Sequence, residues 1–378
     1  MPPALIRRLA LAQLLMLASI ADAADAPPRA VPLRPGAAPA ATAAPAASSG
    51  ASAPKGAPLA TRKLRGVDYV SLADAATRLG LKYTTSDRGR KARLADAKVR
   101  ADLEFDVREA SINGLRVVLG DPVQQAGGQL YISRIDFERC LTPLLRPGLG
   151  VAARAAPRIV VLDPGHGGRD HGTSLHEKTY ALDVARRTKV LLEAKGLRVV
   201  LTRDTDVALE LVERSAIANA ARADLFVSIH FNALPKDTTT SGVQVFTFAP
   251  ANQHAAEWWS TLRLPDPHLE KTEMPVNRHD HWSAALAQGI HRRFVTDLKA
   301  ADRGRKIAHW GVLRGLDCPG VLVECGFLTS TAEAKKISTP AYRQKIAEAL
   351  AAGIRDYAAT VESSRPRAPG ASVAATAR

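Results

Sequence analysis

Four residues in the second half of the sequence have the types and surroundings of a hydrolytic metal site. His166 follows the apolar segment "VVLDPG" within a glycine-rich loop, and His230 lies near the end of "DLFVSIHFN". Glu324 lies near the end of "PGVLVEC", and Glu177 opens a segment with helical periodicity. Two histidines and a carboxylate are the ligands of many catalytic zinc sites, and a second carboxylate can act as general base. The four residues therefore predict zinc-assisted hydrolysis.

Each of these residues also has an ordinary structural explanation. A histidine at a strand end is more often a hydrogen-bonded structural residue than a ligand. A glutamate in the first turn of a helix, such as Glu177, usually interacts with the helix dipole. Glu324 is harder to explain in this way, because a carboxylate at the end of an apolar strand needs a partner. Taken together, the four residues favour a metal site.

Alternating strand and helix patterns must position these residues. From residue 158 the order is strand ("RIVVLD"), helix ("EKTYALDVARRTKVLLEAKG"), strand ("LRVVLTR"), helix ("ERSAIANAARA") and strand ("DLFVSIHFNA"). This order predicts an α/β fold with a mainly parallel sheet flanked by helices on both faces. Ligands of such sheets bind beyond the carboxyl ends of the strands, so all four residues are expected at one rim. Glycines around His166 would let the backbone and the substrate approach the metal closely. Asp163 is expected to hold the ring of His166 by a hydrogen bond.

A small α+β domain is predicted at residues 64–147, before the α/β domain at residues 158–360. "VDYVSLADAATRLGL" predicts a strand and then a helix, with an apolar face that includes Leu72 and Leu79. The pair "NG" at 113–114, between two strand-like segments, predicts a hairpin. "LYISRIDFERCLTPLL" adds a strand and a closing helix. This region carries no constellation of histidines, cysteines or carboxylates that would suggest chemistry.

The two ends of the chain are not predicted to fold. Residues 1–23 have the pattern of a signal peptide, with Arg7 and Arg8 before an apolar run that is too short for a transmembrane helix. Residues 24–63 and 361–378 are rich in small residues and proline and predict a disordered linker and a disordered tail. The expected location is the periplasm or cell envelope, without a membrane span in the mature chain. The export route, general secretory or twin-arginine, stays open.

The formal net charge of +15 favours an anionic partner, such as nucleic acid, acidic lipid or a carboxylate-bearing cell wall. Export argues against nucleic acid. Cys318 and Cys325 flank an extended segment, so their Cα atoms are expected about 23 Å apart. A disulfide spans less than about 7 Å, so Cys325 is expected to be a buried thiol.

Residues 158–358 resemble the zinc-dependent N-acetylmuramoyl-L-alanine amidases of the bacterial cell wall, the amidase 3 family. The resemblance rests on six segments in order: "VVLDPGHGG", "EKTYALDVA", "LEAKGLRVVLTRDTD", "LVERSAIANAARADLFVSIHFNA", "DRGRKIAHWGVLRGLDCPGVLVECGFLTS" and "YRQKIAEALAAGIRDY". It implies one zinc ion bound by His166, Glu177 and His230, with Glu324 as the catalytic residue. Residues 64–147 resemble the N-terminal domain of copper amine oxidases, an accessory module of exported wall proteins.

The resemblance implies hydrolysis of the amide between N-acetylmuramic acid and L-alanine in peptidoglycan. Zinc-activated water would attack the carbonyl, with Glu324 as base and then acid. The alternatives are a zinc peptidase that cuts within the stem peptide, a wall-binding module without turnover, and an activator of another hydrolase. Peptidoglycan is the expected partner, and a protein activator is left open.

The segment 251–281 departs from the family pattern. Some relatives carry an inhibitory helix in this region, with a glutamate on zinc, and Glu257, Glu270 and Glu273 could act in this way. Three prolines in the short insert favour instead a wall of the substrate groove, with Trp258 and Trp259 as contact surfaces. Substrate contacts are further expected at three residues: Asn232, Asn277 and Arg278. Two other histidines are considered as substitute zinc ligands: His171 and His176.

Overall fold

The computed structural model describes residues 58–174, 176–256 and 268–365. The predicted signal peptide, most of the predicted linker and residues 366–378 lie outside the described residues. Two boundaries differ from the sequence prediction: strand β1 begins at Arg62, inside the expected linker, and helix α10 continues to Ser363, inside the expected tail. Within the described part of the chain, no helix combines the length and apolarity that a membrane crossing requires.

The strands of the N-terminal region form antiparallel hairpins. The hairpin predicted at 113–114 is confirmed: Ile112 pairs with Leu115, and both Asn113 and Gly114 have positive φ, as a tight turn requires. The strands are β1 (Arg62–Leu64), β2 (Val67–Ser71), β3 (Lys82–Ser86), β4 (Lys91–Ala95), β5 (Arg100–Glu104), β6 (Glu109–Ile112), β7 (Leu115–Val118), β8 (Gln124–Ala126) and β9 (Gln129–Ser133).

Short helices complete the N-terminal region. The predicted helix is α2 (Leu72–Leu79); Ser71 caps its start by accepting a hydrogen bond from the Asp74 backbone N–H. Its expected apolar face, which includes Leu72 and Leu79, is buried. The remaining helical elements are α3 (Arg134–Asp136), η1 (Phe137–Leu141) and α4 (Thr142–Leu145).

From residue 159 to residue 232 the C-terminal region alternates strands and helices, as predicted. Its strands are β10 (Ile159–Pro164), β11 (Arg198–Leu201), β12 (Leu225–Asn232), β13 (Val243–Phe248), β14 (Asp302–Ala308) and β15 (Gly320–Phe327). Its helices are α5 (Glu177–Glu193), α6 (Leu211–Ala220), η2 (Pro275–His279), α7 (Asp280–Asp297), α8 (Gly311–Arg314), α9 (Thr331–Ile337) and α10 (Pro340–Ser363).

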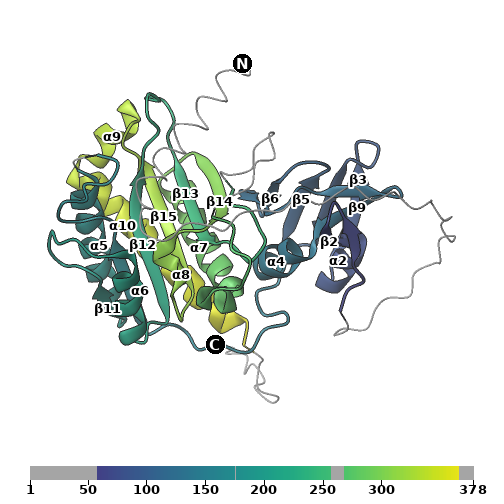
Figure 1. Cartoon of the computed structure of the whole chain (residues 1–378), viewed down its shortest axis with the longest axis horizontal. Helices are drawn as coiled ribbons and strands as arrows, with labels where there is room; N and C mark the ends of the chain where they lie inside the picture. Colours follow the sequence, from purple (N-terminus) through teal and green to yellow (C-terminus); the bar gives the residue numbers. More distant parts are fainter. Residues whose placement is uncertain (1–57, 175, 257–267, 366–378) are drawn as a thin grey trace, which may run out of the picture. The chain divides into compact units, whose positions relative to one another are not determined.

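The central sheet is mixed, which corrects the expectation of a mainly parallel sheet. Among the described residues its eleven strands have the order β11-β10-β12-β15-β13-β14-β7-β6-β5-β4-β3. Strands β11, β10, β12 and β15 are parallel neighbours, but β13 runs antiparallel to β15. From β7 to β3 every ladder is antiparallel. The prediction of a mainly parallel sheet was wrong because the strand–helix alternation that predicts parallel strands is confined to residues 158–232. The other strands of the sheet are connected in other ways. Strands β12, β15, β13 and β14 lie side by side in Figure 1.

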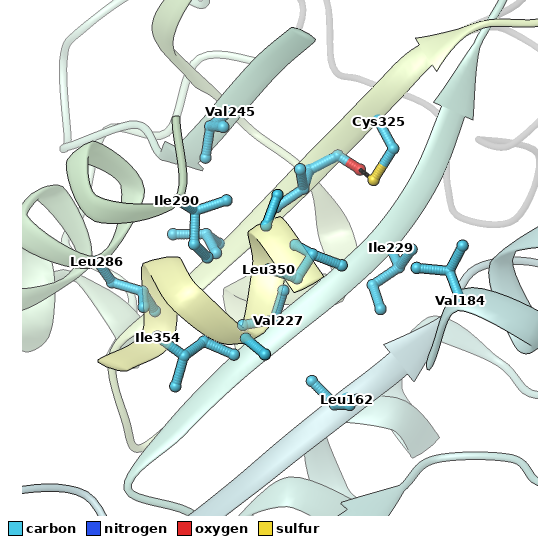
Figure 2. Packing of buried hydrophobic residues seen from close by; sticks show 14 of the residues in the cluster. Leu162, Val184, Val227, Ile229, Val245, Leu286, Ile290, Cys325, Leu350 and Ile354 are labelled. Carbon is cyan, nitrogen blue, oxygen red and sulfur yellow. Dashed lines mark hydrogen bonds between the residues drawn. The ribbon is translucent and has the colours of Figure 1, made fainter. Parts of the chain in front are cut away.

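Apolar side chains cover both faces of the C-terminal part of this sheet. On one face, alternate residues of the strands, such as Val227 and Ile229, pack against α5, α7 and α10 (Figure 2). On the other face, Phe226 and Leu322 belong to a cluster with Val312 of α8. Each fully buried Leu, Ile or Phe side chain contributes about 1.5–3 kcal/mol to stability. The predicted coverage by helices on both faces is therefore present, and it fixes the strand ends in place.

The three cysteines, all among the described residues, are free and buried, which confirms the expectation for Cys325. Its Sγ lies 3.7 Å from the backbone oxygen of Val323, within the core drawn in Figure 2. Burial raises the pKa of this thiol well above its ordinary value. The thiol is therefore a packing group of the core.

Candidate metal centre

Three of the four predicted residues converge at the carboxyl ends of β10 and β12. His166 follows β10 with a φ of 60°, His230 lies in the last part of β12, and Glu177 is the first residue of α5. One ligand atom from each residue lies within 4.8 Å of the other two. The sequence prediction that these residues share one rim of the sheet is confirmed by this geometry.

A single carboxylate oxygen joins the three side chains. Glu177 Oε1 lies 3.1 Å from His166 Nε2 and 3.2 Å from His230 Nδ1. The two imidazole rings meet edge to face, with centroids 4.8 Å apart. The Glu177 side chain is 1% exposed, whereas the two histidine side chains are 18% and 17% exposed. The carboxylate therefore lies at the buried inner end of the site, and the two histidines lie at the end that is open to solvent.

Further hydrogen bonds fix the Glu177 carboxylate. Oε1 accepts from the backbone N–H of Phe231 at 3.1 Å, and Oε2 accepts from the backbone N–H of Thr173 at 2.6 Å. The Thr173 hydroxyl lies 2.7 Å from Oε2. Thr173 was not predicted from the sequence as a residue of the site. Its position four residues before Glu177 is by itself weak evidence for a contact with the Glu177 carboxylate.

Asp170, rather than Asp163, contacts the ring of His166. Its Oδ2 lies 2.8 Å from His166 Nδ1, the nitrogen that does not face Glu177. The prediction for Asp163 is therefore corrected: its side chain is fully buried and accepts hydrogen bonds from Thr202, Ser228 and Arg214.

Asp163 acts on the loop through a buried ion pair. Arg214 Nη1 lies 2.8 Å from Asp163 Oδ1 and also donates to the backbone oxygen of Pro164. Arg214 Nη2 donates to the backbone oxygen of His166 at 3.0 Å. The pair therefore holds the backbone on both sides of Gly165 and sets the direction in which His166 projects.

Two glycines leave the space that the ligand side chains occupy. A Cβ atom on Gly165 would lie 2.3 Å from Cε1 of His230. A Cβ atom on Gly172 would lie 2.3 Å from Oε2 of Glu177 and 2.7 Å from Cδ2 of His166. A side chain larger than hydrogen at either position would therefore displace His230 or Glu177.

The charges of the site favour a protonated imidazole next to an ionised carboxylate when no cation is bound. Burial alone would lower the pKa of His166, but hydrogen bonds and charges of Glu177 and Asp170 outweigh burial and raise it. Burial alone would raise the pKa of Glu177, but the contacts with both histidines outweigh it and hold the pKa far below its ordinary value. A bound cation would take the place of the ring proton beside the ionised Glu177 carboxylate.

Glu324 lies beside this group, on the neighbouring strand. Its Cα partner in the parallel ladder between β12 and β15 is His230, so both side chains lie on the same face of the sheet. Glu324 is 8% exposed. On its other side its partner is Gln244 of β13, whose side-chain oxygen accepts a hydrogen bond from Asn232 at 2.7 Å.

The donor set fits a small tetrahedral cation. Ligands at the usual zinc distances of about 2.0–2.2 Å and with tetrahedral angles lie about 3.4 Å from one another. The two histidine–Glu177 distances of 3.1 and 3.2 Å are close to this value. Asp170 supplies the outer hydrogen bond that metal-bound histidines usually make. The ligand atoms of the two histidines lie within 4.8 Å of each other, so the group could hold a metal ion.

The remaining predicted residues lie apart from this group. The side chain of Asn277 is buried and bonds to the Met274 backbone, the Ala249 oxygen and Asp280, which argues against a substrate contact. Arg278 is exposed and pairs with Asp317 at 2.7 Å.

The residues considered as substitute zinc ligands or as inhibitory glutamates have the following surroundings. His171 is exposed, and the exposed His176 stacks on the ring of Tyr180. Glu270 pairs with Arg314 and Glu273 with Arg139, at 2.9 and 2.8 Å. Glu257, Trp258 and Trp259 lie outside the described residues.

A family model described as N-acetylmuramoyl-L-alanine amidase, Amidase_3, matches residues 160–356, more than half of the chain. The chain belongs to this amidase family. The matched range begins in β10 and ends in α10, so it contains the whole candidate metal centre and Glu324.

Named relatives agree with this assignment. AmiC, an N-acetylmuramoyl-L-alanine amidase of Escherichia coli O6:H1, is 31% identical over 243 residues, which cover 59% of this chain and 58% of AmiC. AmiC of Neisseria meningitidis serogroup B is 32% identical over 250 residues, which cover 59% and 57%. The chain thus spans somewhat more than half the length of these relatives. The crystal structure of an N-acetylmuramoyl-L-alanine amidase from Clostridium difficile 630 is 31% identical, with 54% of this chain and 97% of that chain covered and a TM-score of 0.43.

Proposed function

We propose that this protein hydrolyses the amide bond between N-acetylmuramic acid and L-alanine in peptidoglycan. Membership of the amidase family supports the reaction class. The observation that carries the proposal is the convergence of His166, Glu177 and His230 within 4.8 Å, with Glu324 paired to His230 on the next strand. We further propose that zinc is the metal and that the protein acts in the periplasm or cell envelope.

Each residue has one role in this proposal. His166, Glu177 and His230 hold the ion, and Asp170 orients the ring of His166 through Nδ1. A zinc ion bound by such a set acidifies water and polarises a carbonyl group at neutral pH. Asp163 and Arg214 keep the loop in the conformation that presents His166.

Glu324 is proposed as the proton carrier. A carboxylate beside the ligand His230 is positioned to accept a proton from the attacking water. The same carboxyl group then donates that proton to the nitrogen of the leaving alanine, so that the amine departs neutral. General acid–base catalysis of this kind contributes about 10²–10⁴-fold to a rate.

Analysis of the muropeptides released from purified sacculi tests this proposal. The purified chain, without and with a chelator, is incubated with sacculi, and the new ends are labelled and identified. An amidase exposes free amino groups on L-alanine and leaves intact glycan strands, and the chelator abolishes this. New ends within the stem peptide would instead support the peptidase alternative, and binding without new ends would support a wall-binding module. Either result would overturn the proposed reaction.

A further inference from the structure

A positively charged pocket lies on the same sheet face as Glu324. Its volume is about 180 Å³, and its lining includes three cations, Arg116 of β7 and Arg303 and Lys306 of β14. Glu109 of β6 and Gln244 of β13 also line it. The pocket is therefore built jointly by the N-terminal region and by the sheet that carries the candidate metal centre.

The strand register connects this pocket to Glu324. Glu324 of β15 pairs with Gln244 of β13, so the two side chains are neighbours on one face. Between β13 and β14 the register shifts: Val243 pairs with Asp302 and Val245 with Arg305. Two residues of β14, Arg303 and Gly304, therefore stand opposite Gln244. A bulge of this kind redirects a side chain, and here Arg303 lines the pocket beside Gln244.

The same face continues into the N-terminal region through β7. Arg305 pairs with Val117 in a parallel bridge, so the next residues, Lys306 and Val118, share the opposite face. Arg116 lies on that face too, two residues before Val118, and the Gly304 Cβ position would be 3.3 Å from its Cγ. Gly304 thus leaves room for the Arg116 side chain next to β14.

Contacts with neighbouring groups orient the cations. Arg303 Nε donates to the backbone oxygen of Ser241 at 2.6 Å, and its guanidinium lies over the ring of Phe327 at 5.5 Å. The Lys306 ammonium lies 5.7 Å from the centre of the Phe246 ring. Arg116 is hydrogen-bonded to Glu109, the one carboxylate among the described lining residues. Arg303, whose contacts among the described residues are with neutral groups, adds a positive charge that favours an anion.

We infer that this pocket binds a carboxylate of the stem peptide, and that Arg116 of the N-terminal region helps to select acidic peptides. The inference rests on the proposed function. In a muramoyl peptide the lactyl carboxyl is used in the scissile amide, so the free carboxylates belong to the peptide. Strand β14 is two strands from Glu324 and strand β7, which carries Arg116, is three strands away, about 10 and 14 Å. Two to four extended residues span about 7–14 Å, so a carboxylate two to four residues after the scissile bond reaches the pocket.

Binding of the released peptide tests the pocket without any need for turnover. The full chain is titrated with a stem peptide that has free carboxylates and with the same peptide in which they are carboxamides. The parent chain is expected to bind the carboxylate form about tenfold more tightly, the effect of one hydrogen-bonded charge pair. Arg116→Gln is expected to remove most of this preference, and Arg116→Lys to restore part of it.

Arg93→Gln is the matched control. Arg93 lies on the same face, in the row that pairs Arg93 with Asp102, Asp102 with Ser111, and Ser111 with Arg116. Like Arg116 it is exposed and pairs with a carboxylate of the neighbouring strand, but it does not line the pocket. Arg93→Gln should keep the tenfold preference. An equal preference in the parent, Arg116→Gln and Arg93→Gln chains would overturn the inference.

Hydrolysis of the corresponding muramoyl peptides separates this inference from the proposed function. Arg116→Gln should lower kcat/KM about tenfold for the carboxylate form and leave the carboxamide form unchanged. If the parent chain cleaves neither peptide at the muramoyl amide, the proposed function fails, while the binding titration still tests the pocket. A loss of kcat/KM by the same factor for both peptides would show a structural role of Arg116 and overturn the selectivity.

Discussion

His230 and Glu324 face each other as direct neighbours in the parallel ladder between β12 and β15. The first residue contributes a ligand atom to the candidate metal centre, and the second carries the buried carboxyl group beside it. Their relation is fixed by backbone hydrogen bonds in the centre of the sheet rather than by loops. The proposed division between metal binding and proton transfer would therefore follow from strand pairing.

Glu324→Gln should separate these two roles. The substitution keeps the size of the side chain and removes its ability to accept a proton. We expect the variant to bind zinc with the stoichiometry of the parent and to lose at least about 10²-fold in kcat on sacculi. Metal analysis and muropeptide release on the same preparation check this. Parent-level hydrolysis by the variant would show that another group carries the proton.

Asp170→Asn should weaken zinc binding without unfolding the chain. Asp170 is largely exposed and contacts His166 through one oxygen, so its loss mainly frees the ring. The loss of such an outer hydrogen bond typically costs about 10–100-fold in metal affinity. Competition with a chromogenic chelator measures the affinity, and the melting temperature of the metal-free chain should stay near that of the parent.

Asp163→Asn is expected to lower the stability of the metal-free chain, unlike Asp170→Asn. Asp163 is fully buried and paired with Arg214, which is 4% exposed. Removal of one partner from a buried ion pair costs about 3–5 kcal/mol of stability. Chemical denaturation of the metal-free chain checks this. Equal stabilities for the Asp163→Asn and Asp170→Asn chains would contradict the distinct roles given to these two residues.

Gly165→Ala should displace His230. The added methyl group would lie 2.3 Å from Cε1 of the imidazole, closer than nonbonded atoms permit, so the ring or the loop has to move. Since His230 is a proposed ligand, zinc content should fall together with hydrolysis, even though no ligand has been replaced. A chain that retains the parent's zinc affinity would show that the loop adapts without moving the ring.

The pH dependence of the metal-free chain follows from the raised pKa of His166. The charged ring contributes stability that is complete below its ordinary pKa of 6.5 and is lost as the pH rises through the raised value. With a chelator present, the parent should therefore melt above His166→Gln at about pH 6, and the difference should shrink at about pH 9. Zinc affinity should rise over the same interval, because the proton on the ring has to leave. A difference that grows with pH would contradict this assignment.

The residues of the candidate metal centre could be predicted from the sequence because each stands at the end of a regular element. Apolar strands before His166 and His230 and a helix beginning at Glu177 place three side chains at one rim. The neighbours that orient them could not be predicted in this way. Asp170 and Thr173 belong to an irregular loop, and the partner of Asp163 is Arg214, 51 residues away in the sequence.

The fold could be predicted in its local elements and not in all of its pairings. The hairpin at 113–114 and the helix Leu72–Leu79 follow from turn residues and apolar periodicity. The reversed direction of β13 and the pairing of β14 with β7 depend on contacts between distant segments, which leave no periodic signal. The charged pocket was missed for the same reason, since β6 and β7 are far in sequence from β13 and β14.

Anomalous X-ray scattering at the zinc absorption edge, from crystals of the purified chain, tests the central claim most directly. We expect one zinc peak in contact with His166, Glu177 and His230, and its loss in crystals of Glu177→Gln. Glu193→Gln, at the exposed far end of the same helix, should keep the peak. A zinc peak bound by other residues, or none after zinc is supplied in excess, would contradict the account.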